Sequence, residues 1–205
     1  MAETVSRGSA SRAELLELKR EREIVQEGHR FLDEKRILLA RELLARIKRC
    51  EALQAAFEQQ QRAAHQVLIA ATDEAGLEEL QVHPPLDADA FGIDRRTRKW
   101  LGITLPELAT HDQVPDAFVA DPALQRRQPR PTAEAYRALF ASAGELAGEQ
   151  AALLRLEAEY RKTQRRVRAL EKILLPELDA SQSALESALE EQELEEAVRV
   201  RLAVR

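Results

Sequence analysis

The sequence predicts an all-α fold: a long antiparallel two-helix coiled coil from the N- and C-terminal segments, with a short β-hairpin and loop region in the middle. Apolar residues recur every seven positions in both terminal segments, and prolines gather between them. The 205 residues are 33% charged, 4% aromatic and include only 7 glycines, which favours a thin apolar seam over a broad core. We expect residues 1–205 to form a single domain.

The N-terminal segment, residues 11–79, is predicted to be one helix. No proline interrupts it, and at ~1.5 Å per residue it would be on the order of 100 Å long. Cys50 lies on its apolar stripe, which favours a small buried apolar residue over a reactive thiol. The stripe consists of Leu15, Leu18, Val25, Leu32, Leu39, Leu43, Cys50, Leu53, Phe57, Ala64, Val67 and Ala71.

The middle segment, residues 80–131, cannot form a long helix. Pro84 and Pro85 end the first helix, and further prolines follow as far as residue 131. Residues 90–93 and 100–105 read as two short strands around a polar turn at 94–99. From residue 112 to residue 130 we expect a loop with at most short helical turns.

The C-terminal segment, residues 132–200, is predicted to be the second long helix, with Thr132 as its N-cap. Pro176 interrupts its pattern, at a cost of about 3 kcal/mol unless a bend accommodates the ring. Its seven-residue repeat consists of Leu139, Leu146, Leu153, Tyr160, Val167 and Leu174.

Gly28 is the other helix-weakening residue, because it costs about 0.5–1 kcal/mol relative to alanine inside a helix. This predicts that something approaches the helix closely there. A tolerated accident is the alternative explanation for Gly28 or Pro176 taken singly.

A coil register follows if residues 78 and 133 lie side by side. It places 15–25 beside 186–196, so that Lys19 meets an acidic tail, and it places Pro176 beside Lys35. It also brings two basic groups together as a basic belt, which would need an acidic partner or is otherwise a solvated face. The belt comprises Arg41, Arg46, Lys48 and Arg49 on one helix and Arg161, Lys162, Arg165, Arg166, Arg168 and Lys172 on the other.

Motifs for chemistry are missing from the sequence. It contains no phosphate loop, dinucleotide turn, HExxH pair or CxxC pair, and its 4 histidines are scattered. We therefore expect no catalytic residue, no cofactor and no metal. The net charge of −5 argues against nucleic acid as a partner, and no apolar run approaches the ~18 residues of a membrane span. With no signal peptide at its start, the chain is expected to be cytosolic.

Three motifs together resemble the D subunit of the vacuolar/archaeal-type (V-type/A-type) rotary ATPases. They are Leu18-Lys19 followed by Gly28 and Lys35-Arg36, the stretch WLGITLPEL at 100–108, and RRVRALEKILLPEL at 165–178. Their order and spacing match along nearly the whole chain. Ile37 stands where the family usually has Asp, and Arg168 where Asn is usual, which suggests a divergent bacterial member.

The resemblance implies a noncatalytic central-stalk rotor protein, present as one copy per complex at the inner face of the cell membrane. Its partners would be the catalytic and noncatalytic A and B subunits of the hexamer, the small F subunit of the stalk, and a funnel-like protein that leads to the membrane ring. Rotation would couple ATP turnover to translocation of H⁺ or Na⁺. The candidate hexamer and stalk contacts are Lys19, Gly28, Lys35, Arg36, Arg161, Arg165, Arg166, Arg168 and Pro176.

The expected hairpin has two interpretations. Its candidate residues either cap the base of the coil or form part of a surface presented to the rest of the stalk. They are Phe91, Trp100, Leu101, Gly102 and Pro106. Two other classes stay open for the whole chain: a stand-alone coiled-coil scaffold or export-stalk protein, and a rod that binds nucleic acid.

Overall fold

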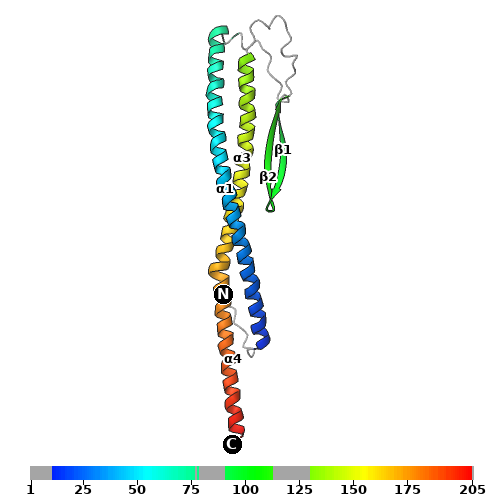
Figure 1. The fold of residues 1–205 in the computed structure, drawn as a ribbon, viewed down its shortest axis with the longest axis vertical. Coiled ribbons are helices and arrows are strands. Elements are labelled where there is room, and N and C mark those ends of the chain that lie inside the picture. Colours follow the sequence, from blue (N-terminus) through cyan, green and yellow to red (C-terminus); the bar gives the residue numbers. More distant parts are fainter. Residues whose placement is uncertain (1–10, 77, 79–90, 113–129, 205) are drawn as a thin grey trace. The chain divides into compact units, whose positions relative to one another are not determined.

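The computed structural model describes residues 11–76, 78, 91–112 and 130–204. Along the chain these form α1 (Arg12–Ala75), β1 (Phe91–Trp100), β2 (Ile103–Asp112), α3 (Arg130–Ala169), the π-helical turn η4 (Leu170–Leu174) and α4 (Leu175–Ala203). Two long helical segments and a two-stranded hairpin are visible in Figure 1. The predicted helical fold with a central hairpin is confirmed. The predicted loops at 80–90 and 113–129 lie outside the described residues.

Helix α1 begins and ends at residues suited to those places. The Ser11 hydroxyl accepts a hydrogen bond from the Glu14 amide at 3.1 Å, as an N-cap does. At the other end Gly76 adopts φ +81°, and its amide donates to the Thr72 carbonyl at 2.9 Å. A glycine in this left-handed conformation commonly ends a helix, so α1 stops short of residue 79.

The hairpin is longer than predicted, and its turn lies elsewhere. Trp100 pairs with Ile103, so the turn is formed by Leu101 and Gly102, at φ 46° and 79°. Positive φ at both central residues is typical of the type I′ turn, which matches the twist of the strands. The predicted turn at 94–99 was wrong: this polar stretch belongs to β1, and its side chains are exposed.

The C-terminal helix stays helical past Pro176 by widening one turn. The Leu175 amide donates to the Leu170 carbonyl, an i to i−5 bond that defines the π turn directly before the proline. The extra residue in this turn provides the accommodation that Pro176 was expected to need. The N-cap predicted at Thr132 was wrong, because α3 begins at Arg130 and the Thr132 hydroxyl has no hydrogen-bond partner among the described residues.

The chain divides into two compact units, Leu39–Glu159 and Met1–Leu38 with Tyr160–Arg205. In the first unit, the C-terminal part of α1 pairs with α3, and the hairpin is seated on α3. Its apolar core contains Leu39, Cys50, Ala64, Leu105, Leu146, Ala152 and Leu156. Cys50 is a buried free thiol, as its place on the apolar stripe predicted.

The second unit pairs the N-terminal part of α1 with the end of α3, η4 and α4. Val167, Leu178 and the hydroxyl-bearing Thr163 are buried in it. Ion pairs connect the two helical segments: Arg12 with Glu193 at 2.5 Å, Lys19 with Glu186 at 2.9 Å, and Arg22 with Asp179 at 2.5 Å. The predicted contact of Lys19 with the acidic end of the chain is therefore present.

The predicted register was nevertheless wrong. Arg22 meets Asp179, which lies outside the segment 186–196 expected beside it. Pro176 is three residues from Asp179, so it lies about one turn from Arg22 and not beside Lys35. Moving one helix by a heptad keeps the same faces in contact, so periodicity fixes the face of a coiled-coil helix and not its axial position.

Candidate functional site

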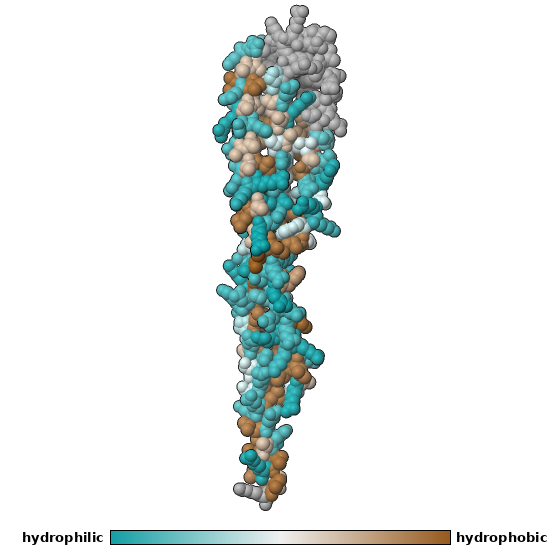
Figure 2. Space-filling view, in the orientation of Figure 1, coloured by the Kyte–Doolittle hydropathy of each residue, from teal (hydrophilic) through white to brown (hydrophobic). Residues whose placement is uncertain are grey.

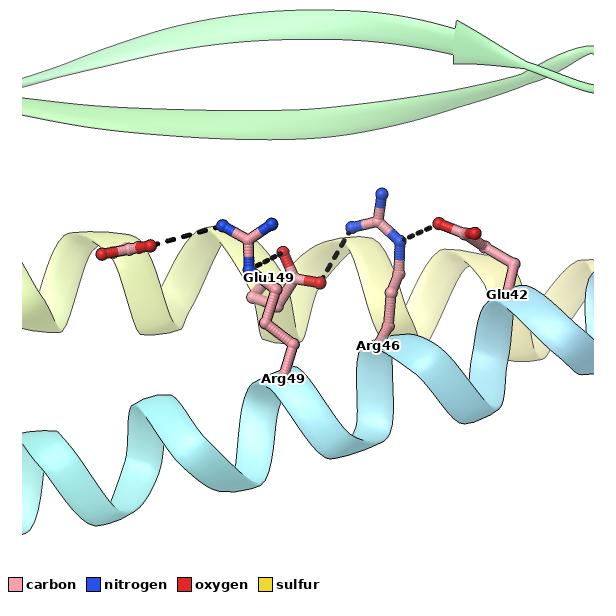
Figure 3. A network of polar contacts seen from close by, with 5 residues as sticks. Glu42, Arg46, Arg49 and Glu149 are labelled. Atoms are coloured by element: carbon pink, nitrogen blue, oxygen red, sulfur yellow. Dashed lines mark hydrogen bonds and ion pairs between the residues drawn. The ribbon is translucent and has the colours of Figure 1, made fainter.

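A polar network joins α1 to α3 in the first unit. Arg46 Nη1 lies 3.0 Å from Glu149 Oε1, and its Nε lies 2.8 Å from Glu42 on α1 itself. Arg49 approaches Glu149 at 3.9 Å and Glu145 at 3.3 Å. Figure 3 shows both arginines projecting from α1 towards Glu149 on α3, with the hairpin strands running past them.

Glu149 is the centre of this network. It is 9% exposed, so its charge is largely removed from water, and two guanidinium groups compensate for that loss. Removing one partner of such a buried pair typically costs about 3–5 kcal/mol, because the other charge stays buried. The network therefore fixes α1 against α3 at one axial position within this unit.

The same contacts correct the predicted basic belt. The register placed Arg46 and Arg49 beside the arginines of 161–168, where like charges would crowd. Instead both pair with glutamates of α3. Of the remaining belt residues, Arg165, Arg166 and Arg168 are exposed and form no ion pair within the described part of the chain, and Arg41, Lys48, Lys162 and Lys172 are exposed as well.

Two glycines of α3 seat the hairpin against the helix. A Cβ at Gly144 would run into the Thr110 side chain, and one at Gly148 would lie 3.1 Å from the Leu108 backbone nitrogen. Phe91 adds an edge-to-face contact with Phe140 of α3, with ring centroids 5.1 Å apart. The hairpin is therefore packed on α3 as a fixed part of this unit.

A cleft of about 460 Å³ lies between the hairpin and the helices. Arg46, Arg49 and Arg98 line it together with Glu107, Glu145 and Glu149. These opposite charges largely neutralise one another, and the lining includes no histidine, cysteine or serine. Two of the three glutamates, Glu145 and Glu149, are engaged in ion pairs with Arg49 and Arg46.

The predicted contact residues of the second unit occupy different settings. Lys19 is paired with Glu186, and this hydrogen bond is the main cause that lowers the pKa of Glu186 below its ordinary value of 4.5. Arg36 pairs with Asp33 within α1 at 2.7 Å, and Lys35 is half-buried. Arg161 and Pro176 are exposed. The unit does not gather these residues into one cluster.

Gly28 lies on a second, exposed apolar stripe of α1. Ile24 and Phe31 flank it, and Leu38 continues the seven-residue spacing, with exposed fractions of 69%, 66% and 43%. No atom of the described chain comes within 4 Å of a Cβ placed at Gly28. The expected close approach is therefore not made by the described chain itself, which leaves an open notch on this stripe.

The predicted hairpin residues divide between packing and exposure. Phe91, Trp100 and Pro106 are half-buried, whereas Leu101 and Gly102 form the exposed turn. The contact of Phe91 with Phe140 supports a packing role for Phe91. The position of Trp100 beside the turn does not decide between its two interpretations.

Over the ranges that the structure describes, no group of three or more metal-binding side chains gathers at one place. None of the helices in those ranges is both long and apolar enough for a membrane span.

The structure defines the class of the protein: it is mostly α-helical, two long helical segments pair within each unit, and a hairpin is seated on α3. The family model described as the D subunit of ATP synthase matches residues 14–205. The chain belongs to this ATP synthase D-subunit family.

Curated relatives agree over nearly the full length. The D subunit of the A-type ATP synthase of Methanopyrus kandleri is 29% identical over 196 residues, covering 93% of this chain and 83% of the relative. The D subunit of the V-type ATP synthase of Anaeromyxobacter dehalogenans (strain 2CP-C), a bacterium, is 29% identical, covering 96% and 95%. The A-type D subunit of Thermococcus sibiricus is 28% identical, covering 93% and 90%.

Sequence reasoning missed Glu149 and the two hairpin-seating glycines. Gly144 and Gly148 lie four residues apart, and so on one helix face, which is a signal for close approach of another backbone. Glu149 carries no comparable signal. It is one glutamate among many, and its burial depends on an axial position that the heptads do not fix.

Proposed function

We propose that this chain is the noncatalytic central-stalk rotor component of a V/A-type ATPase or ATP synthase. It transmits torque between ATP turnover in the hexamer of A and B subunits and H⁺ or Na⁺ translocation by the membrane ring. It acts in the cytoplasm, as a peripheral protein at the inner face of the membrane. Each complex contains one copy of the chain, and the chain forms a single shaft domain. The observation that carries this proposal is membership of the D-subunit family over residues 14–205.

The helix pairing in each unit supports a torque-bearing role. Closely packed protein interiors are stiff and transmit strain. The Arg46–Glu149 pair and the Lys19–Glu186 pair each resist sliding of one helix along the other within its own unit. A single helix has no such cross-connection.

The exposed residues supply the contacts that the proposal needs. Figure 2 shows apolar side chains on the outer surface of the helices among hydrophilic ones. The stripe of Ile24, Phe31 and Leu38 is exposed in the isolated chain, and contiguous exposed apolar surface marks interaction sites. In this proposal the notch at Gly28 receives an apolar side chain of the hexamer.

The remaining partners follow from the same role. The small F subunit binds alongside the paired helices, and the funnel-like protein connects the shaft to the membrane ring. Of the predicted contacts, Arg165, Arg166 and Arg168 provide exposed cations for acidic loops of the hexamer.

Co-expression with the A, B and F subunits of the same source tests the proposal. We expect size exclusion to give one copy of this chain per hexamer, and we expect ATPase turnover to change when the chain is omitted. A self-associating rod that ignores all three partners would instead indicate a stand-alone scaffold.

A further inference from the structure

The outer edge of strand β1 combines two features that together fit one kind of ligand. Arg95, Arg96 and Lys99 are exposed cations on this strand that form no ion pair within the described residues, whereas Arg98 lines the cleft beside Glu107, Glu145 and Glu149. The strand pair has three acidic residues, Asp94, Glu107 and Asp112, and Asp112 lies opposite Phe91 at the end away from the turn. The hairpin therefore has a local positive charge in a chain with net charge −5.

The strand register shows which backbone groups are unpaired. In a two-residue hairpin the pair next to the turn, here Trp100 with Ile103, exchanges both hydrogen bonds, and the pairs then alternate. Thr97 and Pro106 consequently form a pair without hydrogen bonds, where a proline with no N–H costs nothing. By the same alternation, the N–H and C=O groups of residues 93, 95, 97 and 99 point away from β2.

The opposite edge of the hairpin is covered. The Thr104 carbonyl accepts a hydrogen bond from Arg155 of α3 at 3.0 Å, and the Leu108 nitrogen faces Gly148. Both contacts agree with the register, which points the backbone groups of 104 and 108 away from β1. Figure 1 likewise shows β2 on the side of α3 and β1 on the far side.

We propose that the β1 edge binds an extended acidic polypeptide segment as a third strand of this sheet. Main-chain hydrogen bonds to residues 93–99 would supply affinity, and carboxylates would select the cationic edge. Edge cations also protect a strand from pairing with a second copy of itself, since like charges repel. An acidic strand is attracted by the same cations, so the edge would select acidic segments.

A polypeptide fits this edge better than a nucleic acid does. Within the described hairpin, no aromatic side chain is fully exposed for base stacking, which single-stranded nucleic acid would need. The inference goes beyond the rotor role and does not depend on it.

The test uses the full chain and a labelled ten-residue peptide of alternating Glu and Thr, with a Gln and Thr peptide as the neutral probe. Fluorescence anisotropy measures binding, and hydrogen exchange measures protection of the amides of 95, 97 and 99. We expect binding of the acidic peptide only, protection of those amides, and weaker binding as salt rises. Replacing Arg95, Arg96 and Lys99 with glutamine should weaken binding roughly ten-fold.

Two further variants distinguish binding through backbone hydrogen bonds of β1 from binding through charge alone. Thr97→Pro removes an outward N–H and should abolish binding, while Thr97→Val retains that N–H and should bind normally. The charge control is Arg41→Gln with Lys48→Gln, two exposed cations of the same unit, which should leave binding unchanged.

Several results would overturn the proposal. Peptide binding without protection of the β1 amides in the unmodified chain excludes strand addition, whatever Thr97→Pro does to the hairpin. An equal loss in the Arg41/Lys48 variant would reduce the effect to net charge. Binding of a single-stranded oligonucleotide or of anionic vesicles as tightly as the peptide would assign the edge to polyanions in general.

Discussion

At the residue scale, three helical glycines differ in what surrounds them. Gly144 and Gly148 have the hairpin directly over them, whereas Gly28 has open space. A side chain added at Gly148 must displace the Leu108 backbone, while one added at Gly28 displaces nothing within the described chain. All three residues are glycines within helices, so they have the same intrinsic helix propensity. A difference in the effect of one substitution at these sites therefore reports on packing.

The same substitution at both sites therefore predicts opposite effects. Gly28→Leu should raise the free energy of unfolding of the isolated chain by about 0.5–1 kcal/mol, because a strong helix former replaces glycine. Gly148→Leu should lower it by about 1–3 kcal/mol through overpacking against β2. Urea denaturation followed by circular dichroism measures both.

A second readout separates local from global damage in this pair. Hydrogen exchange of the β1 and β2 amides should accelerate in Gly148→Leu and stay unchanged in Gly28→Leu. Equal stability changes at the two sites would contradict the seating of the hairpin on α3.

At the element scale, the π turn and Pro176 depend on each other. The extra residue of Leu170–Leu174 lets the helix continue past a proline that would clash with a carbonyl in a regular α-helix. It also sets the face of α4 on which the buried Leu178 lies. Removing the π turn alone should therefore destabilise the protein, whereas removing the π turn and Pro176 together should not.

Deletion of Ile173, an exposed residue of the turn, tests this dependence. The deletion alone should convert the π turn to an α turn that contains an interior proline, at a cost of about 3 kcal/mol in unfolding free energy. Adding Pro176→Ala should recover most of that loss. Thermal and urea unfolding of the deletion, the double variant and Pro176→Ala alone would measure it, and a double variant as unstable as the deletion would refute the coupling.

The elements also show what sequence could predict. The heptads identified both long helices and put Leu39, Cys50 and Leu146 in the core, because burial of one face requires that periodicity. The turn of the hairpin was predicted at the wrong place, because the exposed polar residues of β1 resemble a loop in sequence. The residue that indicated the true turn was Gly102. The axial register was missed for a different reason: it depends on single contacts such as Arg46 with Glu149, which the heptads do not encode.

At the scale of the whole molecule, charge is distributed unevenly despite a net value of only −5. Cations that lie opposite carboxylates of α3 or α4, such as Lys19 and Arg46, form ion pairs within the chain. Arg165, Arg166 and Arg168 are exposed and have no ion pair among the described residues. Side chains of this kind contribute little to the stability of the isolated chain, so they are available for a partner.

Reversing these three charges to glutamate should therefore leave the unfolding transition of the isolated chain nearly unchanged. Under the proposed rotor role, it should also weaken docking to the hexamer of A and B subunits. Electrostatic contacts at an interface mainly raise the association rate and are screened by salt. We expect slower association at low salt, measured by surface plasmon resonance, and a difference from the unmodified chain that shrinks as salt rises. Arg41→Glu with Lys48→Glu provides the control, because these cations are also exposed but lie in the other unit. If the triple variant docks at the unmodified rate, or if the control loses as much, the three arginines are only a solvated helix face.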